Sequence, residues 1–192
     1  MLIVVRHGRT EANATRRLQG RLDLPLDEVG IAQAAAVAAR IGPVDRVVTS
    51  PLLRARQTGD AFEAAERDVD ERIIEIDYGP LDGTPLTEVP SSVWESWRAD
   101  PSWAPPGGES LTAVDERVHR ALDDLAADAA ERDVVVVSHV SPIKSALTWA
   151  LGVGTEVTWR TWVAQAAIMR IAISPRGPVL QTFNETAPPV SG

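Results

Sequence analysis

The stretch Leu2–His7, with the sequence LIVVRH, decides the fold, because four consecutive apolar residues end abruptly in arginine and histidine. A short continuous run rich in β-branched residues is typical of a strand buried on both faces of a sheet. The stretch Val134–His139, with the sequence VVVVSH, repeats this form much later in the chain. Two such strands indicate a parallel sheet covered by helices on both faces.

The segments around these strands alternate between helical and extended patterns. Leu26–Ile41 carries apolar residues at helical spacing and ends at Gly42 and Pro43, which together form a usual helix stop. The other predicted helices are Leu52–Ala65, Pro85–Arg98, Ser110–Arg132 and Pro142–Leu151; the other predicted strands are Arg46–Thr49, Arg72–Ile76 (or an extended arm there), and a hairpin of Ala166–Ile173 and Val179–Phe183. This order predicts a three-layer α/β sandwich with a mainly parallel central sheet flanked by helices.

The composition describes an ordinary globular chain. Its 192 residues are 44% hydrophobic and 24% charged and include no cysteine, so we expect one domain over residues 1–192, without disulfides or Cys-ligated zinc. The net charge of -8 argues against binding to nucleic acid or to an anionic membrane, because both attract basic surfaces. With no recognisable signal peptide or bilayer-spanning run, we expect a cytoplasmic protein.

The histidines that follow the two apolar strands are the first candidate site residues. Ligands of open α/β sheets bind beyond the carboxyl ends of the strands, so His7 and His139 would enter one crevice if their strands are neighbours. The chain has only three histidines, and two of them stand in this position. Taken alone, such a histidine is more often a hydrogen-bonded structural residue, but the shared context favours a functional pair.

Arginines near the strand ends predict an anion site. Arg6 directly follows four apolar residues, where a guanidinium is costly to bury without an anionic partner. Arg54 opens the helix after the second predicted strand and could share that anion, whereas Arg56 is interpreted as a solvated surface residue. Gly8 would let the backbone approach a ligand closely, although an ordinary turn explains it equally well.

Short polar motifs follow one another in a definite order along the chain. They are RHGRTEAN at 6–13, LQG at 18–20, SPLLRARQT at 50–58, EIDYG at 75–79, PGGES at 106–110 and VSH at 137–139. Together they resemble the histidine phosphatase superfamily (phosphoglycerate mutase-like, branch 1), and the resemblance extends from Leu2 to about Leu151. It implies the phosphoglycerate mutase-like fold, with a small lid region at about 76–108.

The resemblance implies a phosphoryl transfer in which His7 attacks phosphorus and becomes a phosphohistidine. By similarity, Arg6, Arg54 and His139 hold the phosphoryl oxygens, while Glu75 gives and then takes a proton. Because such a transfer depends on positioning and fixed positive charge, we expect neither a metal nor a cofactor. The guanidinium groups would also lower the pKa of His7 and keep its imidazole free to attack. Further phosphate or substrate contacts implied by the resemblance are Gly8, Thr10, Asn13, Gln19, Gly20 and Val140.

The acid has competitors in its own segment. Glu71, Asp77 and Asp82 lie near Glu75, and an acidic loop is as a rule merely solvated. The spacing of Glu75 from Tyr78 and Gly79 favours Glu75 as the proton donor, and Asp77 is the alternative.

Three departures from the family pattern bear on the substrate. Residues 79–83 read GPLDG where many relatives carry GxWEG, and Val140 with Ser141 replaces a frequent glycine pair. The chain also lacks the inserted segment of the resembling glycolytic mutases, which favours hydrolysis. Trp94, Trp97 and Trp103 in the lid would wall a pocket for a hydrophobic ester, although packing is the commoner role for a single tryptophan.

We therefore predict a metal-independent phosphomonoester hydrolase that acts on a small phosphorylated metabolite. A mutase-type isomerase and a non-catalytic binder of phosphorylated ligands are the alternatives. The physiological substrate stays open, as does self-association into a homodimer.

Overall fold

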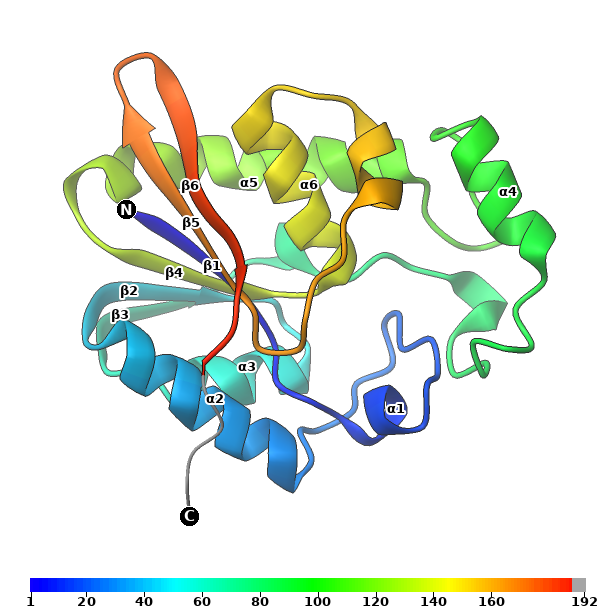
Figure 1. The fold of residues 1–192 in the computed structure, drawn as a ribbon, viewed down its shortest axis with the longest axis horizontal. Helices are drawn as coiled ribbons and strands as arrows, with labels where there is room; N and C mark the ends of the chain where they lie inside the picture. The colour runs from blue at the N-terminus through cyan, green and yellow to red at the C-terminus, as the bar shows by residue number, and fades with distance from the viewer. Residues whose placement is uncertain (188–192) are drawn as a thin grey trace.

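A computed structural model describes residues 1–187 and contains a six-stranded sheet in the order β3-β2-β4-β1-β5-β6 (Figure 1). The first four of these run parallel to one another, and β5 and β6 form an antiparallel hairpin at one edge. The prediction of a mainly parallel central sheet is confirmed. The strands are β1 Leu2–Arg6, β2 Val44–Thr49, β3 Ala64–Val69, β4 Val134–Ser138, β5 Ile168–Ser174 and β6 Gly177–Glu185.

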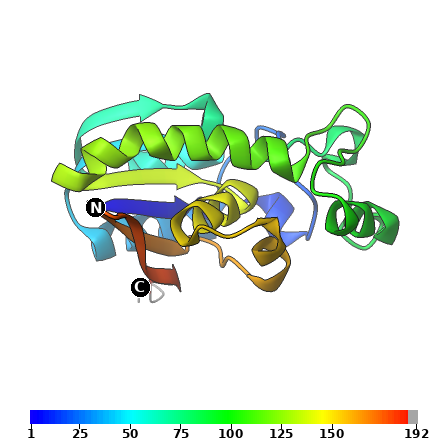
Figure 2. The same cartoon turned by 90° about the horizontal axis from the view of Figure 1, so that it is seen from above.

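Helices cover both faces of this sheet, as the two orthogonal views in Figures 1 and 2 show. Helices α5 and α6 pack on one face, and α2 and α3 on the other. Within residues 1–187, no helix is both long enough and apolar enough to cross a membrane. The helices are α1 Glu11–Ala14, α2 Glu28–Ile41, α3 Leu53–Asp60, α4 Ser91–Ala99, α5 Leu111–Glu131 and α6 Val140–Leu151, with short 3-10 helices η1 Glu71–Ile73, η2 Gly79–Leu81 and η3 Thr155–Arg160.

Alternating side chains along β1 and β4 divide the core between the two faces. Val4 and Val136 belong to the apolar cluster that contains α5 and α6, whereas Val5 and Val137 belong to the cluster that contains α2 and α3. Successive side chains of a strand point to opposite faces. A strand that is apolar at every position is therefore buried on both sides, which explains the two unbroken valine-rich runs.

The register of the sheet brings distant residues together. β1 and β4 are adjacent, and Arg6 pairs with Ser138, so His7 and His139 leave neighbouring strands at the same level. β2 lies on the other side of β4 and pairs Thr49 with Val137. Ser50 consequently follows β2 at the level of Ser138, next to His139.

Predicted boundaries around β3 are wrong. The helix predicted over Leu52–Ala65 ends at Asp60, and the strand lies at Ala64–Val69 instead of Arg72–Ile76, which forms part of η1 and an irregular arm. β3 is a largely exposed edge strand, so its sequence AAERDV lacks the apolar alternation of a half-buried strand. It forms because β2 offers it a pairing partner.

The segment 76–108 stands away from the sheet, on the side where β1 and β4 end (Figure 1). It contains η2 and α4. The helix predicted from Pro85 begins only at Ser91, after an irregular stretch. This arrangement places α4 over the carboxyl edge of the sheet.

Candidate active site

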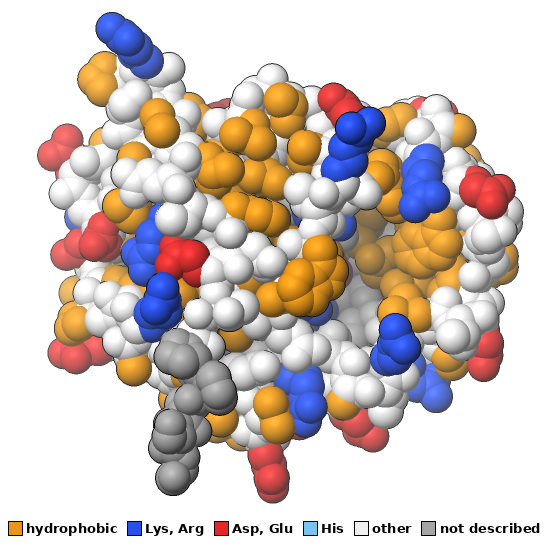
Figure 3. Space-filling view, in the orientation of Figure 1, with side chains coloured by type: hydrophobic (Ala, Val, Ile, Leu, Met, Phe, Trp, Pro, Cys, Tyr) orange, Lys and Arg blue, Asp and Glu red, His pale blue; other side chains and the backbone are white. Residues whose placement is uncertain are grey.

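A cavity of about 290 Å³ lies at the carboxyl edge of the parallel strands. On the face seen in Figure 3, the molecule is hollowed between α4 and the segment around η3, with hydrophobic side chains on the walls. Five residues outside the predicted catalytic and phosphate-binding set line the cavity: Arg17, Leu18, Leu86, Tyr78 and Trp94. The predicted site residues that line it are Arg6, His7, Asn13, Gln19, Gly20, Arg54, Glu75 and Val140.

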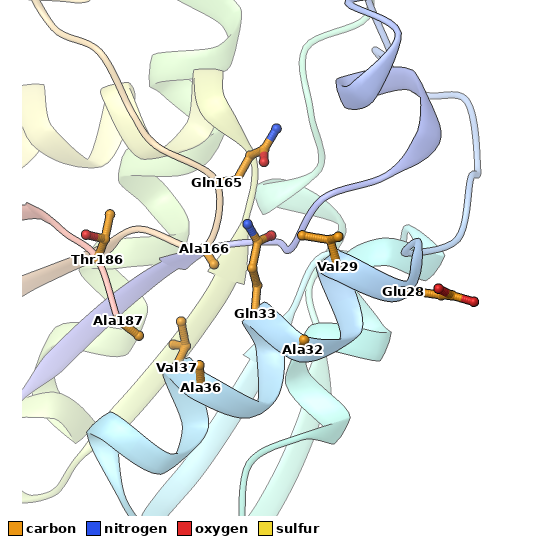
Figure 4. A pocket seen from close by; sticks show the side chains of 10 residues that line it. All are labelled: Glu28, Val29, Ala32, Gln33, Ala36, Val37, Gln165, Ala166, Thr186 and Ala187. Atoms are coloured by element: carbon orange, nitrogen blue, oxygen red, sulfur yellow. The ribbon is translucent and has the colours of Figure 1, made fainter. Parts of the chain in front are cut away.

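A larger cavity of about 480 Å³ lies between α2 and residues 165–187 (Figure 4). Its described lining is mainly small and aliphatic, and Glu28, the one charged side chain among those residues, points away from it. Catalytic or anion-binding chemistry requires several convergent polar groups. The carboxyl edge of the sheet is therefore the candidate active site.

His7 is held as a neutral imidazole whose Nε2 carries no proton. Its Nδ1 donates to the carbonyl oxygen of Gly8 at 2.7 Å, which assigns the proton to Nδ1 and leaves the lone pair on Nε2. The Nε–H of Arg54 points at this Nε2 at 3.3 Å. Burial, together with the charges of Arg54 and Arg6, holds the pKa of His7 well below its usual value. The side chain is thus an unprotonated imidazole that lines the cavity.

Two buried guanidinium groups give the cavity its positive charge. Arg54 donates to the carbonyl oxygens of Leu22 at 2.7 Å and Gly20 at 2.8 Å, and burial lowers its pKa to about 10. Arg6 donates to the carbonyl oxygen of Val163 at 2.7 Å, while its buried Nε–H has no partner among the described residues. Neither arginine forms an ion pair within residues 1–187. An anion in the cavity would supply the missing acceptor and countercharge.

His139 lies next to His7 but deeper. Their ring centroids are 5.1 Å apart, and the His139 side chain is fully buried and does not belong to the cavity lining. Its Nε2 and the hydroxyl of Ser50 share a hydrogen bond of 2.7 Å, as the sheet register leads one to expect. Burial and the neighbouring Arg54 charge hold the pKa of His139 well below its usual value.

Glu75 presents a buried carboxylate to the same cavity. One oxygen accepts hydrogen bonds from the backbone N–H groups of Ile76 at 2.9 Å and Ser141 at 3.1 Å, and the other accepts from Val140 at 3.1 Å. The start of α6 therefore orients the carboxylate. The backbone amide of Val140 points at Glu75, so its nearest partner is the acid.

The competing acids Asp77 and Asp82 do not line the cavity. Asp77 accepts from the N–H of Gly79 at 2.8 Å and lies 3.6 Å from a guanidinium nitrogen of Arg21. Asp82 accepts from the N–H of Arg21 at 2.9 Å, and burial raises its pKa. Of the three carboxylates, Glu75 alone reaches the cavity.

Gly8 and Thr10, which were predicted to contact the ligand, do not line the cavity. Both form hydrogen bonds within the protein instead. The N–H of Gly8 donates to the hydroxyl of Thr58 at 3.1 Å, and a Cβ at Gly8 would meet the carbonyl oxygen of Gly30 at 2.4 Å. The glycine is therefore required by the approach of α2. Thr10 caps α1 by accepting from the N–H of Asn13 at 3.3 Å.

Gln19 and Gly20 form part of the cavity wall. The side-chain oxygen of Gln19 is buried without a partner among the described residues. Gly20 has a φ of 49°, and a Cβ there would come within 1.8 Å of Asp82. Only glycine fits this turn, whose carbonyl oxygen holds Arg54.

Sequence comparison places these residues in a known family. The family model described as histidine phosphatase superfamily (branch 1) matches residues 2–186. The chain belongs to this superfamily. Its curated relatives include a bifunctional protein of Mycobacterium tuberculosis, 39% identical over 87% of this chain and 48% of the relative. This histidine phosphatase superfamily member thus spans about half the length of those relatives. A probable phosphoglycerate mutase of Yersinia pestis is 32% identical over 88% of this chain and 82% of its own length.

Solved structures of the same fold are similar to this superfamily member over nearly its whole length. A phosphoserine phosphatase mutant from Entamoeba histolytica, in complex with phosphoserine, has a TM-score of 0.88 and 28% identity, with 96% of each chain covered. A mycobacterial glucosyl-3-phosphoglycerate phosphatase with bound VO3 has a TM-score of 0.84 and 28% identity, covering 96% of this chain and 99% of that one. The phosphoglycerate mutase-like fold is confirmed.

An ion pair that the sequence analysis missed secures the segment carrying Glu75. Both carboxylate oxygens of Glu109 accept from Arg117, at 2.7 and 2.9 Å. A further nitrogen of Arg117 donates to the carbonyl oxygens of Arg72 at 2.7 Å and Ile74 at 2.6 Å, immediately before Glu75. Glu109 belongs to the PGGES motif and offered a signal, whereas Arg117 lies within α5 without a local pattern to mark it.

Titration of the two buried histidines predicts acid sensitivity. The unfolded chain takes up protons on His7 and His139 below their ordinary pKa of about 6.5, but the folded chain does not, because both pKa values are lowered. The free energy of unfolding should fall as the pH drops from about 6.5 to about 5, by up to roughly 1.4 kcal/mol per pH unit for each histidine. Urea unfolding at a series of pH values measures this slope, and equal stability at about pH 7.5 and about pH 5.5 would contradict it.

Proposed function

We propose that this chain is a phosphomonoester hydrolase that acts on a small phosphorylated metabolite through a phosphohistidine. The observation that carries the proposal is the neutral His7, whose unprotonated Nε2 accepts from Arg54 beside a cavity flanked by two guanidinium groups that form no ion pair within residues 1–187. The printed names of the structural relatives, a phosphoserine phosphatase and a glucosyl-3-phosphoglycerate phosphatase, support the same reaction class.

In the first step, Nε2 of His7 attacks phosphorus, and the bond from phosphorus to the ester oxygen breaks. Arg6 and Arg54 bind the phosphoryl oxygens and stabilise the charge that spreads over them. Glu75 transfers a proton to the leaving oxygen, so that an alcohol departs. The backbone N–H groups around Glu75 then stabilise the carboxylate that results.

In the second step, water attacks the phosphohistidine. Glu75 accepts a proton from this water, the bond from phosphorus to nitrogen breaks, and inorganic phosphate leaves. His139 acts from behind His7. Its buried neutral ring, tied to Ser50, donates toward the phosphoryl group or keeps the His7 ring in place.

A panel of phosphate esters tests this function. With 3-phosphoglycerate, phosphoserine and an aryl phosphate, we expect release of inorganic phosphate and no formation of 2-phosphoglycerate. Because one of the relatives is a probable phosphoglycerate mutase, isomerisation is the competing outcome. Formation of 2-phosphoglycerate without free phosphate would identify a mutase, and tight phosphate binding without turnover of any ester would identify a non-catalytic binder.

Several accompanying expectations also stay predictions. Among the described residues, no group of three or more His, Asp or Glu side chains is arranged to hold a metal ion; phosphate release in the presence of a chelator measures metal independence directly. We further propose that the segment 76–108 acts as a lid over the cavity. The cytoplasmic location, the homodimer and the lack of nucleic-acid or membrane partners stay predictions.

A further inference from the structure

A second, smaller cavity of about 90 Å³ adjoins the candidate active site. Tyr78, Trp94 and Val140 line both cavities, so the space beside His7 leads toward α4 and η3. Trp97 and Trp159 also line the smaller cavity. We call the space bounded by Tyr78, Trp94, Trp97 and Trp159 the aromatic chamber.

The walls of the aromatic chamber are preformed. Trp97 is buried, and its ring centroid lies 5.8 Å from those of both Tyr78 and Trp94. Tyr78 and Trp94 meet edge to face with centroids 6.5 Å apart. On the far side, the guanidinium of Arg98 lies 4.9 Å from the centre of the Trp159 ring and connects α4 to η3. A ligand entering the chamber therefore meets apolar surface that needs no rearrangement.

The chamber offers few partners to a polar ligand. Among the described residues that line it, Lys144 is the one charged side chain, and its amine donates to the carbonyl oxygen of Thr158 at 2.7 Å. Burial lowers the pKa of Lys144. The other polar groups of the lining include the hydroxyls of Tyr78, Ser141 and Thr158 and the buried indole N–H of Trp97, so a leaving group rich in hydroxyl groups would replace only some of its hydrogen bonds to water there. An apolar ring has no such hydrogen bonds to lose, and it gains contact with the aromatic side chains of the walls.

We propose that the substrates of this enzyme are phosphomonoesters whose leaving group carries a planar aromatic ring, bound against Tyr78 and Trp94 at the opening of the aromatic chamber while the phosphate lies beside His7. The proposal rests on the proposed hydrolase function and specifies its substrate class. A cavity of roughly 150 Å³ is enough for benzene. The aromatic chamber, at about 90 Å³, is smaller than this, so the ring would lie where the chamber opens into the cavity of about 290 Å³, against Tyr78 and Trp94, which line both.

Three esters with leaving alkoxides of similar basicity separate ring binding from leaving-group chemistry: benzyl, cyclohexylmethyl and propyl phosphate. For the unaltered chain, we expect kcat/KM for benzyl phosphate to exceed that for propyl phosphate by at least about tenfold. The benzyl ester should also exceed the cyclohexylmethyl ester by about threefold, because edge-to-face ring contacts add to the burial of apolar area. Phosphate release measures all three rates.

Variants at Trp94 locate the effect. Trp94→Leu should bring the ratio of benzyl to propyl kcat/KM close to one, and Trp94→Phe should keep most of it. Trp149→Phe is the matched control, because Trp149 lies on α6, lines neither cavity and donates to Asp123. Its ratio should equal that of the unaltered chain.

The outcomes for the substrate class and for the hydrolase function are distinct. Release of phosphate from all three esters at equal efficiency would overturn the aromatic leaving group and leave the hydrolase function standing. An equal loss of kcat/KM for benzyl and propyl phosphate in Trp94→Leu would assign Trp94 to the packing of α4 and also overturn the proposal. Failure to release phosphate from any ester, here and in the wider panel, would instead refute the hydrolase function.

Discussion

Replacement of His7 by alanine is expected to lower kcat by at least about 10⁴-fold, because the reaction loses its nucleophile. The unaltered chain should form an acid-labile, alkali-stable phosphorylated intermediate that the variant lacks. Acid and alkaline quenching of the reaction with a radiolabelled ester measures both properties. Arg6 and Arg54 keep their positions through contacts to the backbone, so the variant should still bind inorganic phosphate.

His119 provides a matched control for the loss of an imidazole. It lies on α5, with its Nε2 within hydrogen-bond distance of the Ser145 carbonyl oxygen and the Thr148 hydroxyl, both at 3.1 Å. His119→Ala should retain activity and the phosphorylated intermediate. A phosphorylated intermediate in a folded His7→Ala variant would place the nucleophile elsewhere and refute the mechanism.

Replacement of Glu75 by glutamine should have an effect that depends on the leaving group. Propyl phosphate releases a basic alkoxide and should lose about 10²–10⁴-fold in kcat/KM, since general acid catalysis is worth this much. 4-Nitrophenyl phosphate releases a stable anion and needs no proton for the first step. It should therefore give a burst of nitrophenolate followed by slow turnover, because water attack on the phosphohistidine lacks its base.

The same experiment separates a chemical effect from a structural one. In the glutamine variant, an amide nitrogen would face a backbone N–H donor near Glu75, and any resulting disturbance would affect both esters equally. An equal loss for both would thus argue against the acid role. Asp77→Asn and Asp82→Asn are the controls, because neither carboxylate lines the cavity; a leaving-group effect in either would move the assignment to that residue.

Local sequence predicted those parts of the site that follow directly from strand ends. An unbroken apolar run identifies a strand buried on both faces, and the residue after it must reach the carboxyl edge of the sheet. Arg6, His7 and His139 stand at the ends of two such runs. Prediction from apolar patterns failed at β3, whose exposed edge position leaves no apolar alternation to recognise.

The role of each acidic residue depended on contacts that no local pattern encodes. Glu75, Asp77 and Asp82 lie within eight residues of one another, yet only Glu75 reaches the cavity. The Glu75 side chain is oriented by backbone amides at the start of α6, and its segment is secured by Arg117. These partners lie far from Glu75 along the chain, so only the folded arrangement reveals them.

By itself, the sequence determined the layered α/β fold and the family, and it supplied the candidate residues for the proposed phosphoryl transfer. These features depend on hydrophobic periodicity and on motifs of consecutive residues. The tertiary structure alone decided which carboxylate lines the same cavity as His7, that His139 lies behind His7, and that Tyr78 and Trp94 border this cavity. Such properties arise from the packing of segments distant in sequence, and burial is a property of the whole fold and not of any single stretch.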